Sequence, residues 1–116
     1  MTTAVDLSAQ ALPLADVPSR EQMPGMHGKF LHSAAMTFVY WDIEAGAALP
    51  RHSHPHEQVV NMLEGEFELV VDGRAHRLKA GDVLAIPGNA RHSGRAATRC
   101  RILDVFHPVR EDYRFG

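Results

Sequence analysis

One short segment of the sequence concentrates side chains that can bind a metal ion. The chain has eight histidines among its 116 residues, and His52, His54 and His56 lie within five positions of one another. Side chains alternate along an extended strand, so His52 and His54 are expected to point to the same face. Histidine is the commonest protein ligand for late divalent metals, and two imidazoles on one face can hold one ion. The spacing therefore predicts a metal site on this strand.

Two further residues are candidates to complete the site. Gln58 begins the next apolar run, and its amide oxygen can either bind the ion weakly or orient a water molecule. His92 follows the turn Pro87-Gly88-Asn89 on a later strand, so only a closed sheet can bring it to the same point. Together with His52 and His54, these residues give a candidate set of four ligands.

The other histidines are weaker candidates. A single histidine is more often a surface or hydrogen-bonded core residue than a ligand. We therefore interpret four of them as structural or surface residues: His27, His32, His76 and His107. His56 comes after Pro55, and we expect it near the ion rather than bound to it.

Short strands separated by turns must position these side chains. Asp72-Gly73 stands between two alternating runs and predicts a hairpin with a type I′ turn. No segment of a dozen residues keeps an apolar face at helical spacing. The pattern predicts an all-β sandwich or small barrel, with strands near 36–43, 59–63, 67–71, 75–79 and 101–106.

The last strand places an acid in an otherwise apolar row. Cys100, Ile102, Asp104 and Phe106 share one face of this strand, which we expect to line the barrel. A buried aspartate needs either partners or a catalytic task, and Asp104 could also orient a ligand histidine. The guanidinium of Arg110 suits bidentate binding of a substrate carboxylate. Arg110 could instead pair with Glu111, Asp112 or a second subunit. Phe106 could be an ordinary core residue.

Length, composition and charge exclude several classes of protein. The chain has room for one domain, which we place at residues 20–116, after an arm at 1–19 that is flexible or ordered only against the body or a second subunit. The 12 basic and 14 acidic residues leave no positive excess for nucleic acid. There is one cysteine, no apolar run of membrane-spanning length and no secretory signal pattern, so we expect a soluble cytoplasmic protein that does not bind membranes.

The spacing of the candidate ligands resembles that of a known superfamily. The segment from Gly46 to Gly65 resembles the first motif of the cupins: Gly46 is followed after five residues by His52-x-His54, after three more by Gln58 and after six more by Gly65. The segment from Gly81 to His92 resembles the second cupin motif: Gly81 is followed after five residues by Pro87 and after four more by His92. The resemblance implies a double-stranded β-helix, or jelly-roll, barrel with one divalent transition metal inside one mouth.

The resemblance also implies that His52, His54, Gln58 and His92 hold the metal, with Gln58 in the place of the usual glutamate. Three neutral imidazoles and a neutral amide leave the ion its full charge, which favours Lewis-acid chemistry on anionic oxygens. Iron oxygenases commonly use a carboxylate ligand, so its absence disfavours dioxygen chemistry. The metal is open among nickel, iron, manganese and zinc.

A closer resemblance covers most of the chain, from about Pro24 to Tyr113. The segments 52–58 and 102–113 are similar to those of the small cupins of pectin degradation, the KdgF family. That family is associated with opening 4,5-unsaturated uronate monosaccharides, released by pectate or alginate lyases, to linear keto-aldehyde acids. The resemblance implies catalytic roles for Asp104 and Arg110, substrate contacts from Phe106 and Arg110, and a homodimer.

Two other classes of function remain open. One is a different small-cupin metalloenzyme, such as a dioxygenase or a sugar isomerase, which shares the ligands but not the pocket. The other is a non-catalytic cupin that binds a sugar or a metal. If the protein is an enzyme of the KdgF type, its expected partner is a small anionic sugar.

Overall fold

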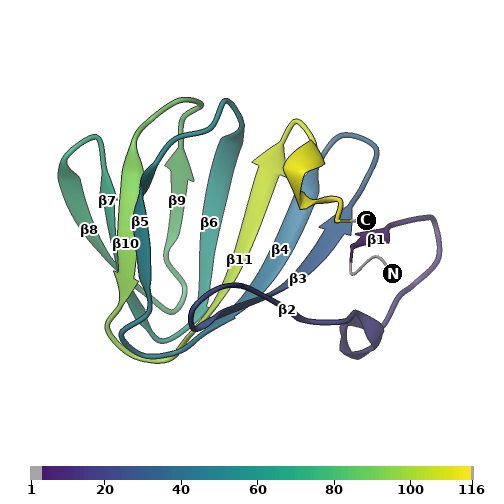
Figure 1. Cartoon of the computed structure of the whole chain (residues 1–116), viewed down its shortest axis with the longest axis horizontal. Helices are drawn as coiled ribbons and strands as arrows, with labels where there is room; N and C mark the ends of the chain where they lie inside the picture. Colours follow the sequence, from purple (N-terminus) through teal and green to yellow (C-terminus); the bar gives the residue numbers. More distant parts are fainter. Residues whose placement is uncertain (1–3, 116) are drawn as a thin grey trace.

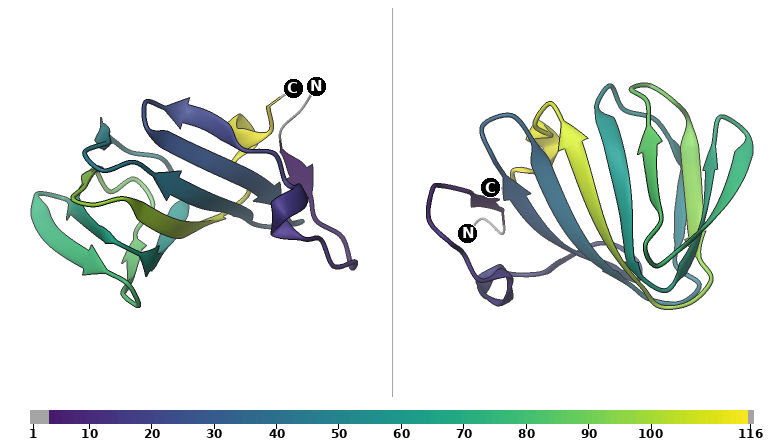
Figure 2. Two further views of the ribbon diagram at one scale, coloured as in Figure 1. Left: turned by 90° about the horizontal axis from the view of Figure 1, so that it is seen from below. Right: turned by 180° about the vertical axis from the view of Figure 1, so that it is seen from behind.

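Two β-sheets face each other in the computed structural model, which describes residues 4–115 (Figures 1 and 2). The larger sheet has seven strands in the order β1-β3-β4-β11-β6-β9, with β2 also paired to β3. Its strands are β1 (Val5–Asp6), β2 (Arg20–Met23), β3 (Met26–His32), β4 (Thr37–Ile43), β6 (Glu57–Glu64), β9 (Val83–Ile86) and β11 (Cys100–His107). The smaller sheet has the order β5-β10-β7-β8. Its strands are β5 (Ala48–His52), β7 (Glu66–Val71), β8 (Arg74–Lys79) and β10 (His92–Ala96).

The architecture is the predicted all-β jelly roll. Adjacent strands are antiparallel except for the short β1, which runs parallel to β3. Crossovers between the sheets, such as that from β4 to β5, place residues from distant parts of the chain around one interior (Figure 1). The described residues include no helix long and apolar enough to cross a bilayer.

The interior is built by alternation along the strands. On β11 the inward residues Cys100, Ile102, Asp104 and Phe106 are all buried, as the sequence predicted. β11 pairs with β4 on one side and with β6 on the other, so it lies in the middle of the larger sheet. The inward side chains of both sheets pack together in one core, and the carboxyl group of Asp104 is buried beside it.

The hairpin predicted at Asp72-Gly73 joins β7 to β8. Both residues have positive φ, 47° and 81°, as a type I′ turn requires. A second hairpin joins β2 to β3 through Pro24-Gly25, with φ of 79° at the glycine. This second turn was not predicted, although proline followed by glycine is a recognised turn signal.

The N-terminal arm lies against the body of the molecule. β1 pairs with the end of β3, Val17 is 2% exposed, and Asp6 forms an ion pair of 2.9 Å with Arg114. Residues 4–19 therefore contact the body, as one of the expected alternatives has it. Residues 1–3 of the predicted arm and residue 116 of the predicted domain lie outside the described part, and the boundary at residue 20 stays a prediction.

Candidate metal centre

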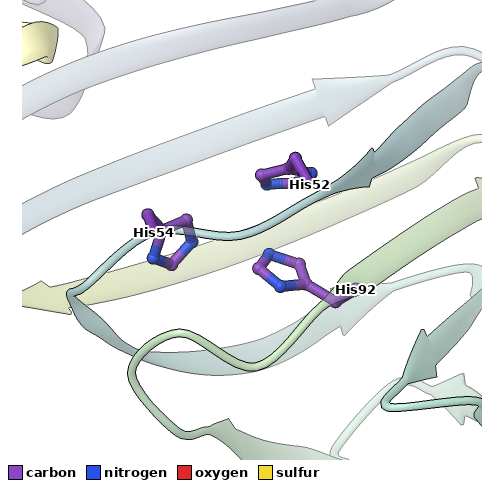
Figure 3. A group of neighbouring side chains, drawn as sticks. All are labelled: His52, His54 and His92. Atoms are coloured by element: carbon purple, nitrogen blue, oxygen red, sulfur yellow. The ribbon is translucent and has the colours of Figure 1, made fainter.

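Three histidines converge at one mouth of the barrel. One ring nitrogen from each of His52, His54 and His92 lies within 4.8 Å of the others, and Figure 3 shows the rings turned toward a common space. His52 is the last residue of β5 and His92 the first of β10, and the two are directly paired. His54 lies in the loop after β5, so the prediction that it shares a strand with His52 was wrong, although the predicted convergence is confirmed.

A close approach of two loops holds His54 in place. The backbone N–H of Asn89 donates to the carbonyl of His54 at 2.7 Å. A Cβ atom on Gly88 would lie 2.5 Å from the carbonyl oxygen of Pro55, so only glycine allows this approach. The loop that leads into His92 is thereby fixed against the loop that carries His54.

Backbone carbonyls set the orientation of all three rings. The Nδ1 atoms of His52 and His92 lie 2.9 Å from the carbonyls of Pro50 and Ala90, and Nδ1 of His54 lies 3.0 Å from the carbonyl of His56. A carbonyl only accepts, so each Nδ1 must carry the proton and donate it. Each neutral ring then presents the lone pair of Nε2, which is the form that binds a metal.

The surroundings keep two of these rings neutral. Burial, together with the nearby charges of Arg110 and His92, lowers the pKa of His54 to about 4. Burial also lowers the pKa of His92. The Nε2 lone pairs of His54 and His92 are therefore available at neutral pH.

The donor set fits a divalent transition metal. The Nε2 atom of His92 is buried and has no hydrogen-bond partner. Gln58, itself buried, places its Oε1 atom 3.1 Å from Nε2 of His54, so that two acceptors face each other. A cation bound by both would satisfy these acceptors together with the orphaned nitrogen of His92. The predicted ligands would thus all contribute: His52, His54, Gln58 and His92.

A buried carboxyl group lies beside these residues. The indole N–H of Trp41 donates to Oδ2 of Asp104 at 2.9 Å, whereas Oδ1 is buried without a partner. Burial raises the pKa of Asp104 to about 6, although the Gln58 amide, the Trp41 indole and the Arg110 charge each act to lower it. Asp104 can therefore hold or release a proton close to neutral pH.

Arg110 packs against two aromatic rings that line the same cavity. Its guanidinium lies 4.0 Å from the ring centre of Tyr113 and 4.9 Å from that of Phe106. Its Nε and Nη2 donate to the carboxylate of Asp112 at 3.2 and 2.6 Å, so the predicted alternative of pairing with Asp112 is confirmed. A substrate carboxylate would have to use the other edge of the fork, at Nη1.

One cavity brings together six of the seven predicted site residues: His52, Gln58, His92, Asp104, Phe106 and Arg110. His54 stands at its margin, in contact with Phe106 at a ring distance of 5.6 Å. Three residues that were not predicted also line the cavity: Gln22, Trp41 and Tyr113. Trp41 could have been found, because it alternates with Val39 and Ile43 on the inward face of β4.

The remaining histidines have other surroundings. His32 is buried and bonds to Thr37 Oγ1 at 2.8 Å and to the Tyr113 carbonyl at 3.0 Å, which confirms a structural role. His27 lies at the surface beside Glu44, at 3.0 Å. His56 contributes its carbonyl to the orientation of His54.

The comparisons with known proteins agree with this geometry. The model of the cupin domain matches residues 39–106, which run from within β4 to within β11 and include every residue of the candidate metal centre. The chain belongs to the cupin family. It is a small cupin that resembles KdgF: it is 33% identical over 70 residues to the pectin degradation protein KdgF of Dickeya dadantii (strain 3937). That match covers 59% of this chain and 64% of the relative.

Solved cupin structures match over nearly the whole chain. KdgF from Halomonas sp. superimposes with a TM-score of 0.85 at 25% identity, over 90% of this chain and 98% of that one. An RmlC-like cupin from Shewanella frigidimarina NCIMB 400 also has a TM-score of 0.85, at 29% identity, over 91% and 96% of the two chains. A salicylate 1,2-dioxygenase from Pseudaminobacter salicylatoxidans shares the fold at 17% identity, over 74% of this chain and 27% of that one, with a TM-score of 0.71.

Proposed function

We propose that this cupin is a metal-dependent enzyme that opens 4,5-unsaturated uronate monosaccharides to linear keto-aldehyde acids. The observation that carries the proposal is the buried carboxyl of Asp104, which has one unpartnered oxygen in the cavity that also contains the histidine cluster and Arg110. The likeness to two KdgF proteins supports this choice of substrate.

The substrate is a cyclic enol ether with a carboxylate and several hydroxyl groups. Arg110 binds the carboxylate through its Nη1 edge while Asp112 holds the other edge. Phe106 and Trp41 supply apolar walls that limit the access of water to the ring. The three histidines and Gln58 would hold a divalent metal, which would supply Lewis acidity toward an oxygen of the substrate.

Asp104 moves the proton. Its free Oδ1 accepts the proton of the hemiacetal hydroxyl as the bond from C1 to the ring oxygen breaks, and Asp104 then returns this proton to the ring oxygen, which becomes the enol hydroxyl. The enol then becomes a ketone by gaining a proton at C4 and losing one from oxygen. The reaction is an isomerisation, so the protons balance. The bond from Trp41 to Oδ2 keeps Oδ1 directed toward the substrate.

The experiment is a rate measurement with unsaturated galacturonate. The conjugated double bond absorbs ultraviolet light, and its loss reports ring opening. Protein loaded separately with nickel, iron, manganese or zinc is expected to accelerate this loss over the spontaneous reaction, and Asp104→Asn is expected to abolish the acceleration with metal content unchanged. Asp42→Asn, at the surface beside Arg99, is the control.

Failure of this test would favour the other classes. No acceleration with any of the four metals would argue for a different small-cupin enzyme or a non-catalytic cupin. Oxygen consumption by the iron-loaded protein with candidate substrates would argue for a dioxygenase. Full activity of Asp104→Asn would remove the proton-transfer role.

A further inference from the structure

A β-bulge places one residue of β2 at the cavity. β2 pairs with β3 through Arg20↔Gly28 and Glu21↔His27, but the next pair is Met23↔Met26, so Gln22 is the extra residue. A bulge redirects side chains and bends the strand, and bulges are common beside active sites. In an unbroken ladder Gln22 would face the side opposite to Glu21 and Met23; with the bulge, both Gln22 and Met23 line the cavity.

The amide oxygen of Gln22 lacks a hydrogen bond. Four side-chain atoms of residues 4–115 are buried without a partner, and three of them belong to residues that line this one cavity: Gln22 Oε1, His92 Nε2 and Asp104 Oδ1. The nitrogen of His92 suits a cation, and Oδ1 of Asp104 suits the proton that is transferred. Gln22 Oε1 is an acceptor that neither role explains.

The chemistry of this acceptor indicates its ligand. A neutral amide oxygen pairs with a hydrogen-bond donor, and a hydroxyl group is the donor that a sugar acid offers. The neighbours Met23 and Met26 are apolar, so they offer no competing polar contact. Arg110 carries the only charge among the cavity residues that suits a carboxylate, which leaves a ring hydroxyl for Gln22.

We propose that Gln22 is a specificity-determining contact that accepts a hydrogen bond from a ring hydroxyl of the bound uronate. This inference rests on the proposed function for the identity of the sugar. A site with an unpaired buried acceptor discriminates against ligands that do not supply the matching donor, because the acceptor then stays unsatisfied.

The test compares Gln22→Met, which keeps the length of the side chain and removes the acceptor, with Glu21→Gln, a conservative exchange at the exposed neighbour on β2 that does not line the cavity. Substrates are the unsaturated uronates derived from galacturonate and from mannuronate, which differ only in the configuration at C2. We expect Gln22→Met to lower kcat/KM about 10-fold, mainly through KM, with bound metal unchanged and Tm unchanged or raised. Glu21→Gln should keep kcat/KM close to that of the wild type.

The outcomes separate the two proposals. A loss confined to one isomer assigns the contact to the hydroxyl at C2, and an equal loss for both isomers assigns it to another hydroxyl. An unchanged kcat/KM for both, or a loss accompanied by a lower Tm, overturns the role of Gln22. If the wild type converts neither isomer, the proposed function fails. Calorimetry with galacturonate and the metal-loaded protein then tests the role of Gln22 separately. Weaker binding of galacturonate to Gln22→Met than to the wild type supports that role, whereas equal binding to both proteins, or no binding to the wild type, overturns it.

Discussion

The buried carboxyl of Asp104 should make the stability of the protein depend on pH in a direction that a surface aspartate does not produce. The pKa of Asp104 rises from 3.8 to about 6 on folding because the side chain is buried. A raised pKa in the folded state means that ionisation favours unfolding. The stability associated with the protonated carboxyl is full below pH 3.8 and is lost as the pH rises through 6.

The magnitude follows from the size of the change in pKa. Each pKa unit corresponds to about 1.4 kcal/mol, so ionisation of Asp104 in the folded protein costs about 3 kcal/mol. The variant Asp104→Asn cannot ionise, and its amide oxygen can still accept the bond from Trp41. Part of this loss already occurs below pH 4, so relative to the wild type Asp104→Asn should gain about 2.5 kcal/mol in unfolding free energy between pH 4 and pH 8.

The assay is urea unfolding of both proteins at several pH values, with a chelator present so that no metal contributes. The difference between the two unfolding free energies cancels the titration of the other groups. Asp42→Asn is the control: Arg99 lowers the pKa of Asp42, so this variant should lose stability relative to the wild type as the pH rises. A difference for Asp104→Asn that stays constant from pH 4 to pH 8, or that falls, would refute the reasoning.

Four further predictions concern the metal, the core, a turn and the assembly. His92→Ala should lose most of the bound metal measured by mass spectrometry, because it removes one of the converging Nε2 atoms, whereas the exposed His107→Ala should keep it. Phe30→Ala should lower the unfolding free energy by about 3–5 kcal/mol in denaturant titration, because this fully buried ring packs against three other aromatic rings. Gly65→Ala should unfold at a lower temperature in calorimetry, since its φ is +84° and a Cβ would lie 2.1 Å from the Arg99 carbonyl oxygen. Light scattering should give the mass of two chains if the expected homodimer forms, and a mass of one chain would contradict that expectation.

Most of the features that could be predicted from the sequence follow from patterns within short segments. The inward face of β11 follows from alternation within one strand, and the turn at Asp72-Gly73 follows from two residues that tolerate positive φ. The convergence of His52 and His92 was predicted because the motif spacing resembles that of cupins, and the two residues are directly paired in the structure.

The missed features depend on contacts between distant segments. β5 ends at His52, and His54 is held instead by a loop that comes more than thirty residues later in the chain. Its direction therefore depends on the approach of Gly88 to Pro55, which alternation along a strand does not describe. The position of Gln22 depends in the same way on an irregular pairing with β3.

The backbone carbonyls that orient the three imidazole rings affect which substitutions the protein can accept during evolution. Every amino acid carries a backbone carbonyl, so replacing the side chains at positions 50, 56 or 90 leaves the acceptors of the Nδ1 protons in place. The wall that would meet the sugar is made of side chains and has no such protection. Mutation can therefore reshape this wall while the geometry of the imidazoles is kept, and one scaffold can acquire new ligands without rebuilding its centre.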